Sequence, residues 1–212
     1  MQKKQRSKIT LSFLNSPTSS FNMTIRSIYK LSLQLFIQPE QAWESISIQK
    51  NSPKQLFSIL ILPLLLLMAV CNFTGYQLFE QNPLQHLNMH LFSASTTFLF
   101  SILSIYISTL LVSKFAQFQN REERFNRAFT LISFSFVPGI LFNSLAFLIP
   151  TINYLTILGL FSFYILYKGI SPILSIPDDK KSGYFTFILI GLLSIYAVLG
   201  AFFIGIAGLM GF

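Results

Sequence analysis

The most constraining feature of this sequence is its longest uncharged run, which extends from Ala128 to Tyr167 without one Asp, Glu, Lys or Arg. As a single α-helix the run would be about 60 Å long at 1.5 Å per residue. That is about twice the 30 Å thickness of a bilayer's hydrocarbon core. The run must therefore fold back, and Pro150 and Asn153 are the turn residues near its middle. The pattern predicts two membrane helices joined by a tight hairpin.

The composition of the whole chain agrees with a membrane location. Only 10% of its 212 residues are charged, against about 25% in a typical soluble domain. Five stretches carry no charged residue, or one only near an end, and each has the roughly 20 residues that a membrane-spanning helix needs. They are residues 56–79, 91–113, 128–149, 151–171 and 184–211. The sequence predicts an all-α membrane protein with five transmembrane helices in a membrane domain of residues 55–212.

Two segments precede this domain. Residues 1–22 begin basic and lack the apolar core of a signal peptide, so we expect a disordered basic tail. The alternative is that the protein starts at Met23. Residues 23–54 carry apolar side chains on one side and basic or polar ones on another, which predicts a cytoplasmic amphipathic or interfacial segment.

The fifteen Lys and Arg residues all fall on one side of the predicted membrane. Eight precede the first span, four lie between the second and third spans, and three lie around the connection between the fourth and fifth. The opposite loops, residues 80–90 and 150–153, and the C-terminus have none. Because Lys and Arg are enriched in cytoplasmic loops, we predict a cytoplasmic N-terminus and a C-terminus outside. The net charge of +8 then needs no nucleic-acid partner.

The stretch QPEQAW predicts the start of a short helix. Pro39 suits the first helical position, and the carboxylate of Glu40 suits the first turn. The only tryptophan of the chain, Trp43, then shares a face with Ile46. Because Trp is enriched at membrane–water interfaces, we interpret this helix as an interfacial anchor with Trp43 at the level of the lipid headgroups. The alternative is a docking helix for a partner, since aromatic residues often dominate binding.

The spans lack the groups that catalysis or ion coupling usually requires. No Asp, Glu or Arg lies in their interior, and Lys168 is expected to reach the membrane interface. The chain has no H-E-x-x-H, G-x-S-x-G or glycine-rich phosphate motif. We therefore expect a protein that is not an enzyme and has no cofactor or metal. The one metal alternative is His86 and His90 with Glu80 nearby; otherwise these histidines are solvated loop residues.

Several residues predict special helix geometry. Pro63 and Pro138 lie inside spans, where proline removes a backbone donor and kinks the helix for packing or, alternatively, for a ligand path. Gly169, Pro172 and Pro177 predict irregular backbone or a short interfacial turn at the end of the fourth span. Two rows of small residues predict close helix contacts within the bundle or, alternatively, between subunits. They are Thr97, Ser101, Ser104 and Ser108 in the second span, and Ala197, Ala201, Gly205 and Gly208 in the fifth.

The order of these features resembles the Yip domain family over about residues 31–212. The resemblance rests on QPEQAW, on ILPLLLLMA, on FTLISFSFVPGILFN and on YILYKGISPILSIPDDKKSGY. It implies a multi-pass membrane protein with a cytoplasmic N-terminus, in a family named for interaction with Ypt/Rab GTPases. The Asp-Leu-Tyr-Gly-Pro motif of eukaryotic members has no match here. The chain is therefore more similar to the bacterial branch, which implies a location in the bacterial inner (cytoplasmic) membrane.

The resemblance also implies a function. We expect a non-enzymatic scaffold or partner subunit that acts through its cytoplasmic face, linked to membrane organisation or trafficking. The expected partners are the lipid bilayer, a protein at the cytoplasmic face and, alternatively, further copies of this chain. The alternative function is a component of a small-solute or lipid transporter. The candidate structural or partner motif consists of Pro39, Trp43, Pro63, Pro138, Gly169 and Pro177.

Overall fold

The computed structural model describes residues 25–49, 52–81 and 84–209, and these contain helices but no β-strand. The predicted disordered tail, residues 1–22, lies outside the described residues. In chain order the helices are α2 (Ile25–Ile37), α3 (Pro39–Ile48), α4 (Pro53–Leu56), the π-helix η1 (Phe57–Ile61), α5 (Leu62–Phe79), α6 (Leu87–Ser113), α7 (Arg121–Ser135), α8 (Val137–Leu148), the 3₁₀ helix η2 (Pro150–Leu160), α9 (Phe161–Leu174) and α10 (Lys181–Leu209).

Within this part of the chain, five helical stretches are long and apolar enough to cross a membrane. The prediction of an all-α protein with five spans is therefore confirmed, and the turn of the predicted hairpin lies between α8 and η2. The stretches are Pro53–Phe79, Leu87–Ser113, Arg121–Leu148, Pro150–Leu174 and Lys181–Leu209.

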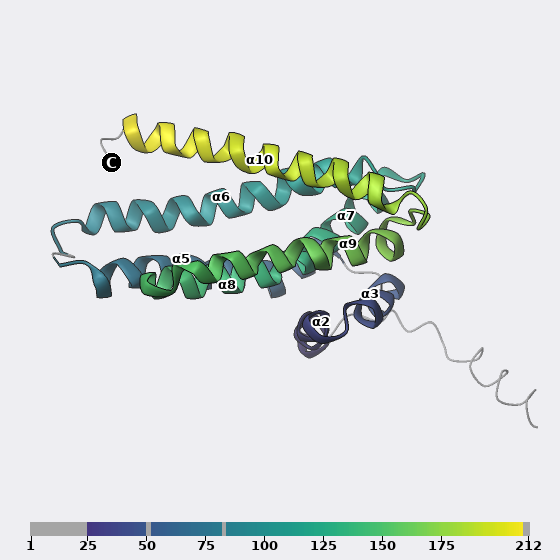
Figure 1. Cartoon of the computed structure of the whole chain (residues 1–212), viewed down its shortest axis with the longest axis horizontal. Helices are drawn as coiled ribbons and strands as arrows, with labels where there is room; N and C mark the ends of the chain where they lie inside the picture. Colours follow the sequence, from purple (N-terminus) through teal and green to yellow (C-terminus); the bar gives the residue numbers. More distant parts are fainter. Residues whose placement is uncertain (1–24, 50–51, 82–83, 210–212) are drawn as a thin grey trace, which may run out of the picture.

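In the view of Figure 1 the spans lie in two groups, with α5, α8, η2 and α9 on one side and α6 and α10 on the other. The two groups are in contact, because α6 also packs against α5. The core lies around α7, which contacts both α6 and α9 and whose residues from Ala128 to Ser135 are all buried. Helix α10 is packed least, because only Ile188 and Leu192 of its residues are buried.

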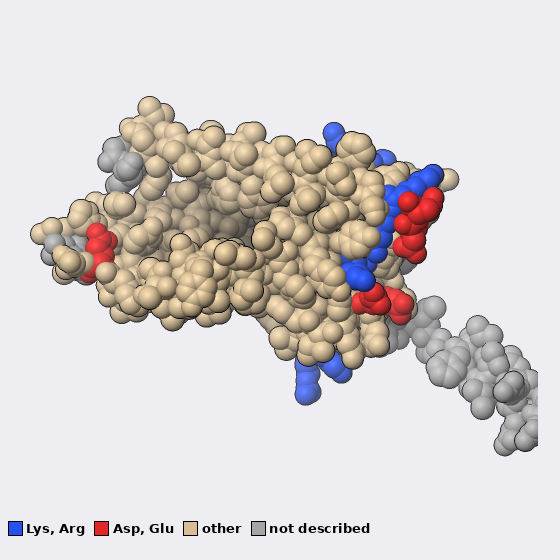
Figure 2. All heavy atoms as spheres, in the orientation of Figure 1, with Lys and Arg blue, Asp and Glu red and all other residues tan. Residues whose placement is uncertain are grey.

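The two N-terminal helices lie against one end of this bundle. Figure 1 views α2 along its axis while the spans run across the picture, so α2 runs crosswise to them. Helix α2 contacts α3 and η1, and α3 contacts α9. Lys and Arg gather at this same end in Figure 2, and we call it the basic end. The opposite end, called the far end, carries the connections from α5 to α6 and from α8 to η2.

At Pro63 and Pro138, a side chain of another helix forms a hydrogen bond with the nearby backbone. Pro63 has no N–H for the carbonyl of Ile59 four residues earlier, and the hydroxyl of Tyr29 in α2 donates to that carbonyl at 2.8 Å. At the second site the helix breaks at Phe136, just before Pro138. There the N–H of Gly139 donates to the Ser162 hydroxyl oxygen of α9 at 2.8 Å. Helix irregularity is therefore coupled to packing between helices.

The fourth span leaves helical geometry later than Pro172. Helix α9 continues through Pro172 to Leu174, because proline removes only one hydrogen bond from a helix and here it falls in the last turn. The helix ends at Ser175, which has a left-handed φ of 57°, and a turn follows before α10, so the irregular backbone lies at the end of the predicted stretch. At the start of the same span, η2 is interrupted at Ile152, which has a non-helical φ of -104° and ψ of 26°.

The two rows of small residues have opposite environments. In α6, Ser104 and Ser108 are buried within the bundle, as predicted for contacts inside one chain. In α10, the expectation of packing within the bundle is wrong. A Cβ added at Gly205 or Gly208 would meet no atom within 4 Å. The row in the fifth span faces away from the other helices because α10 contacts α6 and α9 through its other side.

Candidate functional site

The side chain of Trp43 is inserted between α3 and the membrane helices. It is 0% exposed. Its Nε1–H donates to the carbonyl of Ile165 in α9 at 3.0 Å. Its ring packs edge-on against Phe134 of α7, with the ring centres 6.3 Å apart. The indole is therefore enclosed by contacts within the chain and is not an exposed aromatic docking surface, and its depth relative to the lipid headgroups stays a prediction.

Gly169 provides the surface on which Trp43 rests. A Cβ on Gly169 would lie 2.6 Å from Cε2 of Trp43 and 2.5 Å from Cδ1 of Leu131. No real Cβ fits at such distances, so glycine is required there unless the tryptophan moves. The structure thus brings together two of the motif residues that the sequence singled out separately.

Polar contacts fix the rest of α3. Lys168 Nζ donates to Glu40 Oε1 at 2.7 Å, so the predicted approach of Lys168 to the interface ends in an ion pair. This hydrogen bond and the lysine's positive charge lower the pKa of Glu40. At the other end of the helix, Arg127 Nη1 donates to the carbonyl of Ser47 at 2.6 Å. Together with the Tyr29 hydroxyl, these contacts attach α2 and α3 to three different spans.

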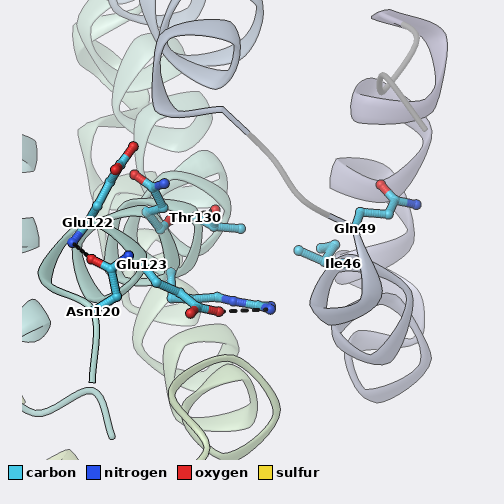
Figure 3. A pocket seen from close by; sticks show the side chains of 8 residues that line it. Ile46, Gln49, Asn120, Glu122, Glu123 and Thr130 are labelled. Atoms are coloured by element: carbon cyan, nitrogen blue, oxygen red, sulfur yellow. Dashed lines mark hydrogen bonds and ion pairs between the residues drawn. The ribbon is translucent and has the colours of Figure 1, made fainter. Parts of the chain in front are cut away.

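A polar pocket of about 250 Å³ lies at the basic end between α3 and α7 (Figure 3). Ile46 and Gln49 line one side. The side chain of Asn120 caps α7 by accepting from the N–H of Glu122 at 3.0 Å. Gln49 Oε1 is buried without a hydrogen-bond partner among the described residues. The other lining residues are Glu122, Glu123, Asn126, Arg127 and Thr130, all on α7.

This pocket has the chemistry of a binding site. Its charged groups are two carboxylates and one guanidinium, and Arg127 Nη2 lies 3.8 Å from Glu123 Oε1. Glu122 forms no ion pair within the described part of the chain. The lining contains neither Cys nor His. The carboxylate of Glu122 on one side and the unpaired amide oxygen of Gln49 on the other favour a ligand that donates hydrogen bonds or carries positive charge.

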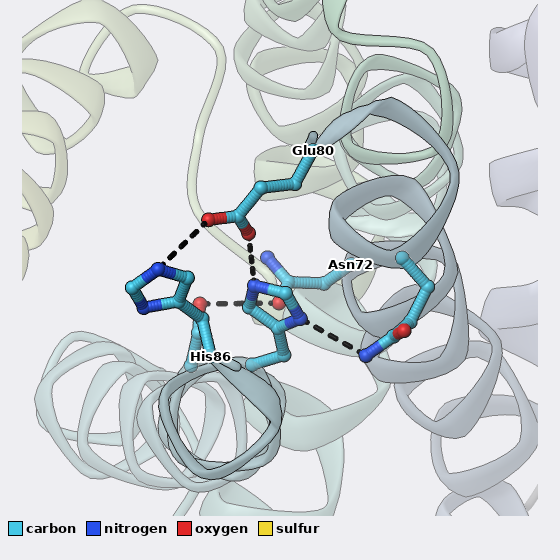
Figure 4. A network of polar contacts seen from close by, with 6 residues as sticks. Asn72, Glu80 and His86 are labelled. Atoms are coloured by element: carbon cyan, nitrogen blue, oxygen red, sulfur yellow. Dashed lines mark hydrogen bonds and ion pairs between the residues drawn. The ribbon is translucent and has the colours of Figure 1, made fainter. Parts of the chain in front are cut away.

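A second polar cluster lies at the far end, between α5 and α6 (Figure 4). His90 is 1% exposed, so it is not the solvated loop residue that was the expected alternative to metal binding. Its Nε2 is hydrogen-bonded to the carboxylate of Glu80, and the amide Nε2 of Gln77 approaches its Nδ1 at 3.0 Å. Tyr76 stacks on its ring, with the centres 5.2 Å apart. His86 is half-exposed, with Nε2 3.9 Å from Glu80 Oε1.

The hydrogen bonds of His90 join two helices. Its Nδ1 faces the amide of Gln77 and its Nε2 faces the carboxylate of Glu80, and both of these residues lie at the end of α5. The histidine thus serves as a bridge between α5 and α6. No group of three His, Cys, Asp or Glu arranged to hold a metal occurs among the described residues. Below this cluster, Ser93 Oγ donates to Asn72 Oδ1 at 3.1 Å.

A larger cavity, of about 580 Å³, lies between the two groups of spans. It touches α5, α6, α8, α9, η2 and α10, and it reaches the kink at Gly139. Six aromatic rings contribute to its wall: Phe100, Phe136, Phe147, Phe163, Tyr196 and Phe203.

The remaining motif residues lie apart from one another. Pro39 is the first residue of α3, whereas Pro63 and Pro138 lie in different spans. Pro177 forms the turn before α10, where its carbonyl accepts from the N–H of Lys180 at 3.1 Å. Reasoning from sequence missed Tyr29 and Arg127. The sequence signal for Tyr29 was a hydroxyl-bearing residue in a helix that precedes an intramembrane proline. For Arg127, no local sequence pattern indicated a contact with Ser47.

Comparison with known proteins agrees with this architecture of five spans and an attached N-terminal helical segment. No curated protein and no solved structure matches the chain. A family model does match, and it covers the end of α2, all of α3 and all five spans. The chain belongs to the Yip1 domain family, whose model matches residues 33–211.

Proposed function

We propose that this Yip1 family membrane protein is a non-enzymatic scaffold whose basic end faces the cytoplasm and docks a partner protein in the pocket between α3 and α7. The observation that carries the proposal is the pocket itself, built against a helix held by Trp43, Glu40 and Ser47. A preformed site needs little ordering when a partner binds. A link to membrane organisation or trafficking follows from the family resemblance.

The charges of the pocket support a basic segment as the docking element. A cavity of about 250 Å³ lies below the roughly 300–1,000 Å³ range of small-molecule pockets, so it suits one or two side chains of a protein. Glu122 offers a carboxylate, and Gln49 Oε1 offers a buried acceptor. Each of these groups suits the cationic side chain of a Lys or Arg, which carries only hydrogen-bond donors. The cytoplasmic placement is supported by the gathering of Lys and Arg at this end.

Site-specific photocrosslinking in native membranes tests the docking proposal. A photoreactive residue replaces Asn126 in the pocket or, as the matched control, Gln41 on the exposed side of α3. We expect a discrete protein adduct only from position 126, and we expect the substitution Glu122→Lys to remove it. Adducts with lipid alone, or identical adducts from both positions, would contradict the proposal.

The alternative function, a component of a small-solute or lipid transporter, is favoured by the cavity of about 580 Å³ between the spans. A measurement of flux across a membrane distinguishes the two functions. Proteoliposomes containing the purified chain are loaded with small solutes or labelled lipid. Movement across the membrane that depends on the protein supports transport, whereas its absence beside a specific adduct at position 126 supports the scaffold.

A further inference from the structure

The cavity between the spans has polar groups set in a largely apolar lining. Thr96, Asn143 and Thr156 belong to the parts of their helices nearer the far end, and the apolar Phe147 lies in the same part of α8. Leu65 and Leu193 line the cavity nearer the middle of the bundle. The cavity therefore offers hydrogen-bonding groups within an apolar surface, which suits an amphiphile.

The polar groups retain free hydrogen-bonding capacity. Among the described residues, the side chain of Asn143 makes one hydrogen bond, from Nδ2 to the carbonyl of Gly139 at 2.8 Å. An asparagine amide has two N–H donors and an acceptor, so one N–H and the oxygen remain available. Ser162 accepts from the N–H of Gly139, and its own hydroxyl hydrogen is not used in that contact. The free N–H of Asn143 and the hydroxyl hydrogen of Ser162 are donors, and donors match the ester oxygens of a lipid.

The weakly packed helix α10 leaves the cavity accessible from the bilayer. Its buried residues, Ile188 and Leu192, both lie in its first half. Farther along, a Cβ at Gly200, which lines the cavity, would meet nothing within 4 Å. Figure 2 shows the surface hollowed between the two groups of spans. A chain-like ligand can thus enter sideways without crossing the polar ends of the protein.

We propose that this cavity binds one acyl chain of a membrane phospholipid. The chain lies among the aromatic rings, and its ester group contacts Asn143 near the far end. The volume of about 580 Å³ is that of a ligand site rather than a packing defect. The cavity lies within helices long enough to span a bilayer. This location favours a lipid over a water-soluble ligand. Lipid binding here does not depend on the docking pocket between α3 and α7.

Two glycine substitutions on α10 provide the test. Gly200→Phe fills the cavity, and Gly205→Phe places the same side chain on the same helix outside the cavity lining, with open space at both positions. The full chain is reconstituted with a phosphatidylcholine that carries a diazirine in one acyl chain. After illumination, the labelled peptides are identified by mass spectrometry. We expect label on the peptides containing Phe147 and Tyr196, reduced at least fivefold by Gly200→Phe and unchanged by Gly205→Phe.

A third variant is the control for loss of labelling through misfolding. Asn143→Leu removes the polar partner while keeping the side-chain size, and it should lower the same labelling at least twofold with little change in melting temperature. Equal labelling in all variants would mean that lipid only surrounds the helices, and would overturn the proposal. Crosslinks between two copies through the cavity residues would also overturn it, by assigning the cavity to a second chain.

Discussion

The indole ring of Trp43 lies so close to the backbone of Gly169 that a methyl group on the glycine would come within 2.6 Å of Cε2. This contact joins a helix at the basic end to the fourth span. Because Trp43 is the only tryptophan of the chain, its fluorescence reports on α3 alone. The packing of the N-terminal segment against the membrane domain can therefore be measured directly.

The first prediction concerns the contact between Trp43 and Gly169. Gly169→Ala should push the tryptophan out of place, lower stability by about 1–3 kcal/mol as overpacking does, and shift Trp43 emission to longer wavelength. Gly183→Ala is the matched control, since a Cβ there would meet nothing within 4 Å. The measurements are the thermal transition in detergent and acrylamide quenching. Unchanged quenching in Gly169→Ala would show that the indole does not rest on this glycine.

The second prediction concerns the carbonyl that accepts from Tyr29. Tyr29→Phe should cost about 0.5–1.5 kcal/mol, because Ile59 loses a donor that Pro63 cannot replace. In the Pro63→Ala background, a backbone N–H becomes available to this region and the same tyrosine substitution should cost less. A double-mutant cycle on thermal stability measures the coupling. Additive effects would indicate that the tyrosine and the proline act independently.

The third prediction concerns pH. The pKa of Glu40 is lowered in the folded protein, first by the hydrogen bond from Lys168 and then by its charge. A lowered carboxyl pKa contributes stability that is present above the group's ordinary value of 4.5 and is lost as pH falls through the folded value. Trp43 fluorescence should therefore become more easily quenched on acidification below about pH 4.5. Added salt should weaken the contact as well, because the pair is exposed to solvent.

The control for this pH effect lies on the same helix. Glu40→Gln should make Trp43 quenching less dependent on pH in this range, whereas Glu44→Gln should not, because Glu44 forms no ion pair among the described residues. An identical acid response in both variants would assign the effect to other carboxyl groups.

The fold was predictable because its signals are local and strong. The uncharged run from Ala128 to Tyr167 is too long for one span, and Pro150 supplies the turn. Local pattern did not place the end of α9, which accommodates Pro172 within its last turn. It also failed at Gly205, because a row of small residues specifies that a helix can be approached closely but not whether a neighbour is present.

The site was predictable only in part. The sequence marked Trp43 and Gly169 as special, but contacts between distant segments decide what such residues touch. Trp43 was interpreted from the average behaviour of tryptophan at membrane interfaces, whereas its environment is set by Ile165 and Phe134. His90 was misjudged for the same reason, since Gln77 and Glu80 remove it from solvent.

The fourth prediction concerns orientation. If the basic end is cytoplasmic, a reporter fused after Phe212 should be extracytoplasmic, and one inserted between Lys114 and Arg121 should be cytoplasmic. An alkaline phosphatase fusion, which is active only outside the cytoplasm, measures the first, and a fluorescent protein measures the second. A cytoplasmic C-terminus would contradict the orientation derived from the positive charges.

The last prediction compares two glycines of α10. At Gly191 a Cβ would lie 2.5 Å from Cδ2 of Leu111 in α6, whereas at Gly205 it would meet nothing within 4 Å. Gly191→Leu should therefore force α10 away from α6 and lower stability by about 1–3 kcal/mol. Gly205→Leu should change it by no more than about 0.5 kcal/mol, as is usual for surface positions. Both are measured as melting temperatures in detergent at low protein concentration. A fall for Gly205→Leu that appears at high protein concentration and shrinks on dilution would reveal a contact between copies of the chain, because an interface on this face dissociates on dilution while packing inside one chain does not.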